Sequence, residues 1–286
     1  MIVADIILIV ISLAALIFAS ITDIKIKEVP DWLSYGLIAS GLIIRLLNAI
    51  TFKEYSYFIY GILGFGSMFI VGELLYHGKL WGGGDAKLLM GLGATLATTP
   101  FYLESSKIPF LLIVLMFILF TGALYGLSWS IFLIFKEPKK FKTEFKKMNQ
   151  SQSSKIIKIL SMLLVTLFLI AIILLPINGI VKIFSSILML LFLVYPYLFI
   201  AVKSLENIHL YVYLPTSKIV EGDWIARDVK INNKLVFSKK TTVTKRDIKH
   251  LKDLNIKRVL VKDGIPFVPP FLIGTIIALL IGNPLS

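Results

Sequence analysis

The sequence predicts an all-α polytopic membrane protein of about eight transmembrane helices, with a small α/β module near its C-terminus. Hydrophobic residues make up 57% of the 286 residues and charged residues only 16%, whereas soluble domains carry about 25% charged residues. Apolar runs of roughly 20 residues, the length that crosses a hydrocarbon core of ~30 Å, recur along the chain. One long polar stretch, Ser204 to Gly264, precedes the last of these runs.

The apolar runs and the polar stretches divide the chain into consecutive segments. A membrane core of about five helices is expected over residues 1–135, followed by a flexible basic loop over 136–155. Two additional transmembrane helices are expected over 156–202. The α/β module then takes residues 203–265, and a C-terminal transmembrane helix takes 266–286.

Each predicted membrane helix rests on one apolar run. The fourth run is short, so its helix should extend back through the glycines that precede it, and Pro176-Ile177-Asn178-Gly179 should break the sixth run from the seventh. The last run has three prolines in its first turns, where a missing N–H group costs least. The runs cover residues 3–21, 32–50, 55–76, 87–99, 108–135, 156–175, 180–202 and 266–281.

The polar stretch contains the helix-cap and turn signals of a small folded module. Thr244 followed three residues later by Asp247 resembles a capping box, which predicts a helix through Leu254. The turn Asp263-Gly264 should close the last strand. The predicted strands are residues 210–214, 224–226, 234–237 and 258–261.

Lysine and arginine predict the orientation in the membrane. They gather between Lys136 and Lys158 and again between Lys203 and Lys262, whereas the opposite set of loops has little beyond Lys53 and Lys107. We therefore expect a multi-pass cell-membrane protein in contact with the lipid bilayer, with its N-terminus outside and its basic loops cytoplasmic. The net charge of +13 follows from this topology, and nucleic-acid binding is not expected, because no base-reading motif accompanies the basic tracts.

Two aspartates at the predicted cytoplasmic edge are the main candidates for chemistry. Asp23 closes the first run and Asp85 opens the fourth, and ionisable residues at the rim of a membrane are expensive to keep. Repulsion between two close carboxylates keeps one of them protonated, so one can activate water while the other polarises a peptide carbonyl. This chemistry needs no metal and no cofactor. The chain has no cysteine, which excludes thiol catalysis, cysteine zinc sites and disulfides.

The segment Gly82-Gly83-Gly84-Asp85-Ala86-Lys87 contains a GxGD motif with a trailing lysine, and its glycines let backbone or an extended substrate approach closely. Together with Asp23 and the Val29-Pro30-Asp31 segment that follows it, this motif resembles the archaeal prepilin and preflagellin peptidases, a family of integral-membrane aspartyl proteases. The resemblance implies Asp23 and Asp85 as the catalytic pair. It also implies Gly82 and Gly84, with Lys87, as substrate-binding or supporting residues.

The resemblance further implies a substrate and a branch of the family. The expected partners are pilin-like or archaellin precursors, cut between a short basic leader and a hydrophobic helix. Because the chain lacks cysteine, the zinc-binding loop of bacterial members is absent and their methylation activity is not expected. The two additional helices over 156–202 favour the pilin-specific archaeal branch over the flagellin-specific one.

Simpler interpretations of these residues remain open from sequence alone. Asp85 could be a helix N-terminal acid, and Asp23 could be an interfacial charge paired with Lys25 or Lys27. Asp31 is expected to cap the second helix. Two further sets complete these expectations: Glu73 and His77 should share a helix face, and close helix packing should account for Gly61, Gly64, Gly91 and Gly93.

Three other functions compete with leader-peptide cleavage. A presenilin-like GxGD protease would cut inside a membrane helix, but its first acid should lie deep in a span. A proton-coupled transporter would use the paired carboxylates as a relay and should show repeated halves, which are not apparent. A non-catalytic membrane assembly protein would tolerate loss of either aspartate.

Overall fold

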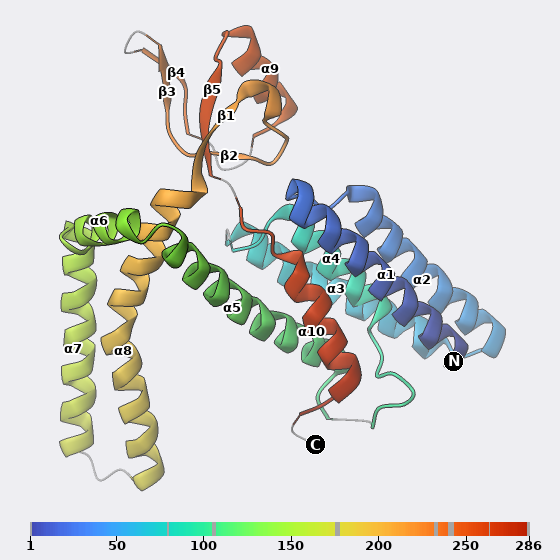
Figure 1. Ribbon diagram of the computed structural model, residues 1–286. Helices are drawn as coiled ribbons and strands as arrows, with labels where there is room; N and C mark the ends of the chain where they lie inside the picture. The colour runs from blue at the N-terminus through green and yellow to red at the C-terminus, as the bar shows by residue number, and fades with distance from the viewer. Residues whose placement is uncertain are drawn as a thin grey trace. The chain divides into compact units, whose positions relative to one another are not determined.

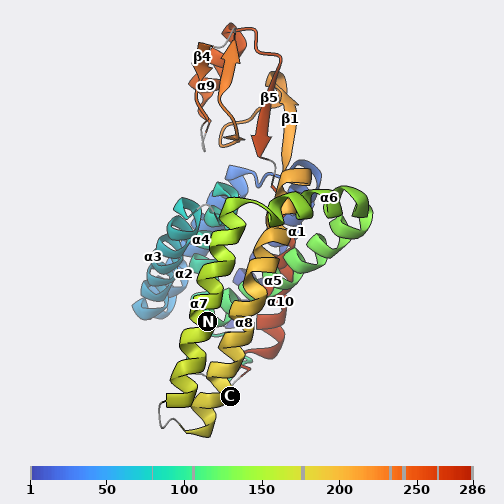
Figure 2. The same ribbon diagram turned by 90° about the vertical axis from the view of Figure 1, so that its left-hand side faces the viewer.

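The computed structural model describes residues 2–78, 80–104, 107–174, 178–231, 234–239, 243–262 and 264–284. The chain divides into two compact units: unit 1 is residues 1–127 with 264–286, and unit 2 is residues 128–263. Each unit is described by itself below (Figures 1 and 2). The predicted breaker at Pro176 and Ile177 and the predicted turn at Asp263 lie outside the described residues.

Unit 1 is a helical bundle, and its helices match the predicted membrane core closely. Each helix begins or ends within a few residues of its apolar run. The helices are α1 (Ile2–Ile26), α2 (Asp31–Phe52), α3 (Tyr55–His77), α4 (Gly83–Thr95), the first part of α5 (Phe110–Lys136) and α10 (Val268–Ile281).

Six helices of the described chain are long and apolar enough to cross a membrane: α1, α2, α3, α5, α7 (Gln152–Leu174) and α8 (Gly179–Leu205) with its continuation to Leu210. The other two predicted spans, α4 and α10, have only 13 and 14 residues. At 1.5 Å per residue such helices are about 20 Å long, shorter than a hydrocarbon core of ~30 Å. The protein is therefore a polytopic helical membrane protein with six full-length spans among its described residues.

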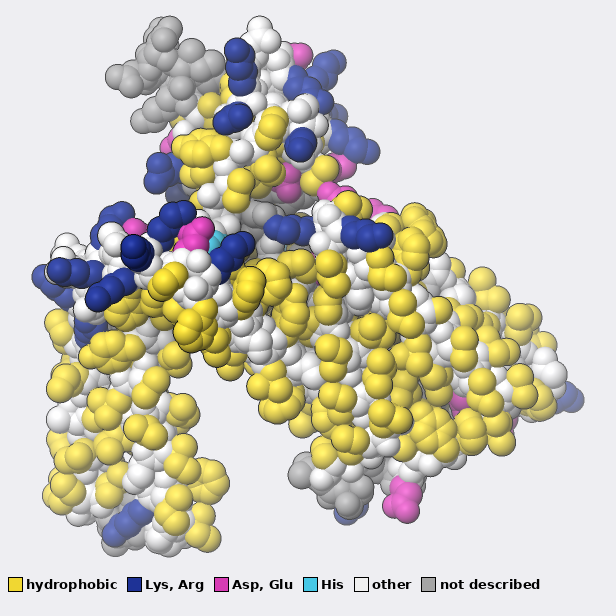
Figure 3. Space-filling view, in the orientation of Figure 1, with side chains coloured by type: hydrophobic (Ala, Val, Ile, Leu, Met, Phe, Trp, Pro, Cys, Tyr) yellow, Lys and Arg dark blue, Asp and Glu magenta, His cyan; other side chains and the backbone are white. Residues whose placement is uncertain are grey.

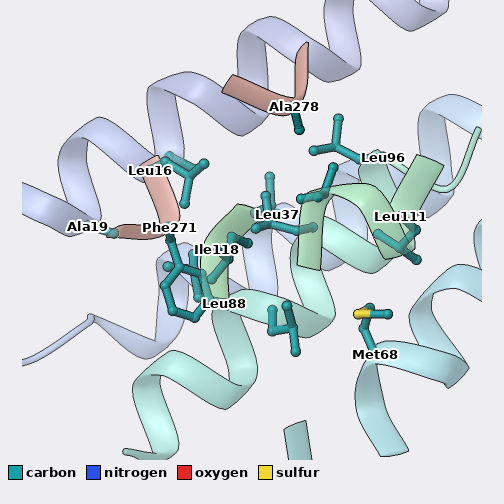
Figure 4. Close-up of a cluster of buried hydrophobic side chains, with 14 of the residues drawn as sticks. Leu16, Ala19, Leu37, Met68, Leu88, Leu96, Leu111, Ile118, Phe271 and Ala278 are labelled. Atoms are coloured by element: carbon teal, nitrogen blue, oxygen red, sulfur yellow. The ribbon is translucent and has the colours of Figure 1, made fainter. Parts of the chain in front are cut away.

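The core of unit 1 draws on helices from both ends of the chain. Leu16 of α1, Leu88 of α4 and Phe271 of α10 each have an exposed fraction of 0%. Figure 4 shows these side chains in one cluster with others from α2, α3 and α5, all of them apolar. Helix α10 is thus an integral part of the bundle, although more than a hundred residues separate it from α5 in the sequence.

Helices α3 and α4 pack at the distance that only glycine allows. A Cβ atom added to Gly64 would lie 2.3 Å from the Gly93 carbonyl oxygen, and one added to Gly93 would lie 2.5 Å from that of Gly64. Similar crowding surrounds Gly61 and Gly91, where an added Cβ would meet Arg45 and Leu37 within 2.8 Å. The predicted packing role of all four glycines is confirmed.

A buried arginine closes the C-terminal end of the short helix α4. The Arg45 side chain is fully buried and donates hydrogen bonds to the carbonyl oxygens of Ala94 and Thr95, both at 2.9 Å. It also donates to the Tyr57 carbonyl oxygen at 3.2 Å, and the Tyr57 hydroxyl donates to Asp5 at 2.6 Å. The last carbonyl groups of a helix lack intrahelical partners, so Arg45 satisfies groups that would otherwise be buried unpaired.

Unit 2 contains a helix where the sequence predicts a flexible loop. Helix α6 (Pro138–Asn149) begins with proline at its first position, where the missing N–H group is tolerated. Phe141 and Phe145 lie one turn apart with ring centroids separated by 5.6 Å, and both are half-buried while the lysines of this helix are exposed. The loop prediction for 136–155 is wrong, because most of these residues are helical and α6 packs against α8.

Helices α7 and α8 form an antiparallel pair whose apolar side chains remain mostly exposed, as Figure 3 shows. Asn178 begins α8, its side chain accepting a hydrogen bond from the Val181 N–H. Leu163 of α7 and Leu190 of α8 are 62% and 60% exposed. Such exposure is the expected surface of a helix in lipid.

The predicted α/β module is present in unit 2. Antiparallel strands β1 (Tyr211–Pro215), β5 (Arg258–Lys262) and β2 (Trp224–Ile225) form a sheet in that order, and β3 (Val229–Ile231) pairs with β4 (Lys234–Phe237). Strand β3 is missing from the sequence prediction. Thr244 is the N-cap of helix α9 (Lys245–Asp253), and Asp247 completes the predicted capping box. The buried core of the module is Ile219, Ile225, Val243, Leu251, Val259 and Val261.

Candidate active site

Asp23 lies three residues before the end of α1 and is turned toward helix α10. Its side chain is 6% exposed, and its Oδ2 atom accepts a 2.8 Å hydrogen bond from the Val268 backbone N–H. Val268 is the first residue of α10. Lys27 lies within electrostatic range of the carboxylate. Asp23 is therefore buried against α10, with Lys27, one of the two lysines of the simpler interpretation, in its electrostatic surroundings.

Asp85 is the third residue of α4 and closes the first turn of its own helix. Its Oδ2 atom accepts a 3.1 Å hydrogen bond from the Gly82 N–H, the geometry of a helix N-terminal acid. Asp23 lies within electrostatic range of this carboxylate. Asp85 therefore accepts the Gly82 N–H at the start of α4 and at the same time lies near a second carboxylate, from α1.

The glycines before Asp85 allow the chain between α1 and α2 to approach. A Cβ atom added to Gly84 would lie 3.1 Å from Cβ of Val29 and 3.5 Å from its backbone nitrogen. At Gly82 the nearest atom would be the Asp85 carboxylate oxygen, at 3.3 Å. At Gly84, the neighbour that comes close is the chain's own Val29 segment.

Lys87 forms an ion pair that joins α4 to α2. Its Nζ atom lies 2.6 Å from the Asp31 carboxylate and 5.4 Å from the centre of the Tyr35 ring. Pro30 occupies the N-cap of α2, and Asp31 is the first residue of the helix. No side-chain hydrogen bond caps the start of α2. The predicted cap at Asp31 is therefore wrong, because this carboxylate binds Lys87.

The two other polar residues singled out in the sequence, Glu73 and His77, contact each other. Glu73 and His77 share a face of α3, as predicted, with 3.1 Å between their side-chain atoms and both side chains exposed. Among the described residues, no group of three or more His, Cys, Asp or Glu side chains is placed to hold a metal ion.

Three residues near the acids were not predicted as site residues. Val268 contacts Asp23 through its backbone, and Tyr125 of α5 lies within electrostatic range of Asp23. Trp81, directly before the glycines, is 7% exposed and packs on Phe267 and Phe271. For the hydrogen bond between Val268 and Asp23, the sequence offers one signal, the proline pair after Val268. That pair predicts the start of a helix but not which residue the helix start contacts.

The first part of the chain has known relatives. Residues 10–132 match the type IV leader peptidase family. The matched segment contains Asp23, the GxGD motif with Asp85, and Lys87. The predicted resemblance is therefore confirmed over residues 10–132, a range that ends within α5 and excludes α10.

Similar proteins include peptidases of two named kinds. A preflagellin peptidase of Methanococcus voltae is 32% identical over 143 residues, which are 46% of this chain and 61% of that protein. A preflagellin peptidase of Methanococcus maripaludis is 36% identical over 85 residues, 30% of this chain and 36% of that protein. The prepilin peptidase EppA of Methanothermobacter thermautotrophicus is 31% identical over 90 residues, 32% of this chain and 23% of that protein. The chain thus spans less than two thirds of the length of each.

Proposed function

We propose that this protein is a membrane aspartyl endopeptidase that removes the short leader peptide from pilin-like or archaellin precursors. The observation that carries the proposal is the placement of Asp23 and Asp85, two acids from separate helices that lie within electrostatic range of each other, inside the segment that matches the type IV leader peptidase family. The names of the relatives, preflagellin peptidase and prepilin peptidase, support the substrate class.

The proposed chemistry divides the work between the two acids. The ionised carboxylate takes a proton from water as the water oxygen attacks the scissile carbonyl carbon, and the protonated carboxyl donates its proton to the carbonyl oxygen. Collapse of the tetrahedral intermediate breaks the C–N bond: the leaving amine takes the proton that the first carboxylate received from water, and a hydroxyl of the intermediate returns a proton to the second acid. The backbone N–H groups of Val268 and Gly82 orient the two carboxylates.

The positions of the acids along their helices support cleavage at the cytoplasmic membrane face. Asp23 lies three residues from the end of α1, and Asp85 lies in the first turn of α4. Neither acid lies midway along a full-length span, which argues against a presenilin-like enzyme that cuts inside the membrane. With the N-terminus outside, both helix ends would face the cytoplasm.

The proposal is tested by co-expressing the protein with a pilin-like precursor or an archaellin precursor. Wild type is compared with Asp23→Asn and Asp85→Asn, which remove ionisation with little change of shape, and with Glu73→Gln as a matched change of an exposed acid. Mass spectrometry of the mature N-terminus locates the cut.

We expect wild type and Glu73→Gln to cut between the basic leader and the hydrophobic helix. Both aspartate variants should accumulate uncut precursor at equal membrane levels. Full cleavage by either aspartate variant would contradict a catalytic role for that acid. If wild type cuts neither precursor, the proposed substrate class is wrong.

A further inference from the structure

Two backbone N–H groups at the start of α10 interact with Asp23: that of Val268, its first residue, and that of Phe267, which precedes it. Helix α10 begins Val268-Pro269-Pro270, and proline has no N–H. The first N–H groups of a helix have no intrahelical partner and carry the positive end of the helix dipole. The Val268 N–H donates to the Asp23 carboxylate at 2.8 Å, and the Phe267 backbone is a second hydrogen-bond partner of the same carboxylate.

Helix α5 fixes this turn by close packing. A Cβ atom added to Gly122 would lie 2.5 Å from Cζ of Phe267, and one added to Gly274 would lie 2.7 Å from the backbone of Ile118. The Thr121 hydroxyl donates to the Pro270 carbonyl oxygen at 2.9 Å. Contacts of this kind leave α10 little freedom to slide along α5.

Trp81 connects the same turn to the segment that carries the other acid. Its ring centroid lies 5.8 Å from that of Phe267 and 4.9 Å from that of Phe271. The residue after Trp81 is Gly82, whose N–H binds Asp85. Trp81 thus packs on the residue before Val268 and directly precedes Gly82, so it is connected to an N–H donor of each acid.

We propose that Trp81 and the first turn of α10 form the positioning element that fixes Asp23 relative to Asp85. Trp81 is a positioning residue, because it acts through Phe267 and Phe271 and touches neither carboxylate in the contacts described. The inference rests on the proposed function, since it assigns a role in the same reaction. It also brings into the site a helix that lies outside the segment matching the peptidase family.

The first test uses the purified full chain in detergent, with a pilin-like precursor as substrate. Trp81→Ala removes the indole, Trp81→Phe keeps an aromatic ring, and Leu80→Ala is the matched control, since Leu80 is 73% exposed in the same loop. A misplacement of about 1 Å can reduce a rate by about a hundredfold. We expect Trp81→Ala to lower kcat at least about tenfold with KM nearly unchanged, and Trp81→Phe to recover most of it.

A second pair of variants addresses the N–H group itself. Val268→Pro removes the N–H that donates to Asp23 at 2.8 Å while the Phe267 N–H stays, and it disfavours the helical conformation of Phe267. Val268→Ala removes only side-chain atoms. We expect kcat of Val268→Pro to fall at least about tenfold below that of Val268→Ala. If Val268→Pro does not fold, the Trp81 variants decide alone.

Thermal unfolding of each variant separates positioning from stability. A kcat of Trp81→Ala within twofold of wild type, per folded molecule, would overturn the inference, and so would a rise in KM with kcat intact. Asp23→Asn and Asp85→Asn are measured alongside. If both are inactive while Trp81→Ala is fully active, only this inference fails; if either is active, the proposed function fails as well.

Discussion

The backbone N–H of Val268 donates a 2.8 Å hydrogen bond to the Asp23 carboxylate across 245 residues of sequence. The bond ties the end of the first helix to the beginning of the last one, and both belong to unit 1. A buried carboxylate needs such a partner, because an unpaired acid away from water is strongly unfavourable. The N-terminal acid and the C-terminal helix therefore depend on each other.

The first prediction concerns the contact between α3 and α4. Gly64→Ala should lower the thermal midpoint of the purified protein, because its new methyl group would lie 2.3 Å from the Gly93 carbonyl oxygen. Gly66→Ala, on the same helix with open space around it, should leave the midpoint unchanged or raise it. Equal midpoints for the two variants would contradict the close packing.

The second prediction concerns the cap of α4. Arg45→Met should destabilise the protein by about 2–6 kcal/mol, because it leaves the buried carbonyl groups of Ala94 and Thr95 without donors, at about 1–3 kcal/mol for each. Unfolding in a denaturing detergent measures this loss. Leu47→Ala, at a 59% exposed position of the same helix, is the control and should have a smaller effect. A midpoint for Arg45→Met equal to that of the control would show that the cap does not stabilise α4.

The third prediction separates two roles for Lys87. If Lys87 only joins α4 to α2, then Lys87→Met and Asp31→Asn should have the same small effect, since an exposed ion pair contributes about 0.2–1 kcal/mol. The double variant should be no worse than either single one. We expect this result in both thermal midpoint and KM. A higher KM for Lys87→Met alone would instead indicate direct contact with substrate.

The fourth prediction concerns recognition of the precursor. The basic leader would meet the protein's own basic loops unfavourably, so recognition should depend on the hydrophobic helix of the substrate. Replacing that helix by an unrelated apolar sequence should reduce kcat/KM more than exchanging leader residues. The reverse ranking, measured with purified precursors, would contradict this account.

The membrane helices could be predicted closely because each rests on a long apolar run, and a chain in lipid must satisfy its backbone internally. The loop prediction for α6 failed because the lysines dominate its composition, while Phe141 and Phe145 supply the apolar stripe. The sequence also did not reveal that α4 has only 13 residues. Its end depends on Arg45, a residue from another helix whose role no local pattern reveals.

The sequence predicts the two acids but not how they are held. Asp23 and Asp85 stand out because few ionisable residues lie at the ends of the apolar runs. Their donors are backbone N–H groups, which every sequence contains, so the Val268 contact could not be predicted from residue types. Trp81 likewise resembles an interfacial anchor until its contacts with Phe267 and Phe271 are known.

The most direct test of the central claim compares purified wild type, Asp23→Asn, Asp85→Asn and the double variant on one precursor. Acids that act as a unit give strongly non-additive effects. The account predicts that each single variant loses at least about a thousandfold in kcat/KM and that the double variant loses little more. A single variant that stays within tenfold of wild type would contradict a catalytic pair formed by Asp23 and Asp85.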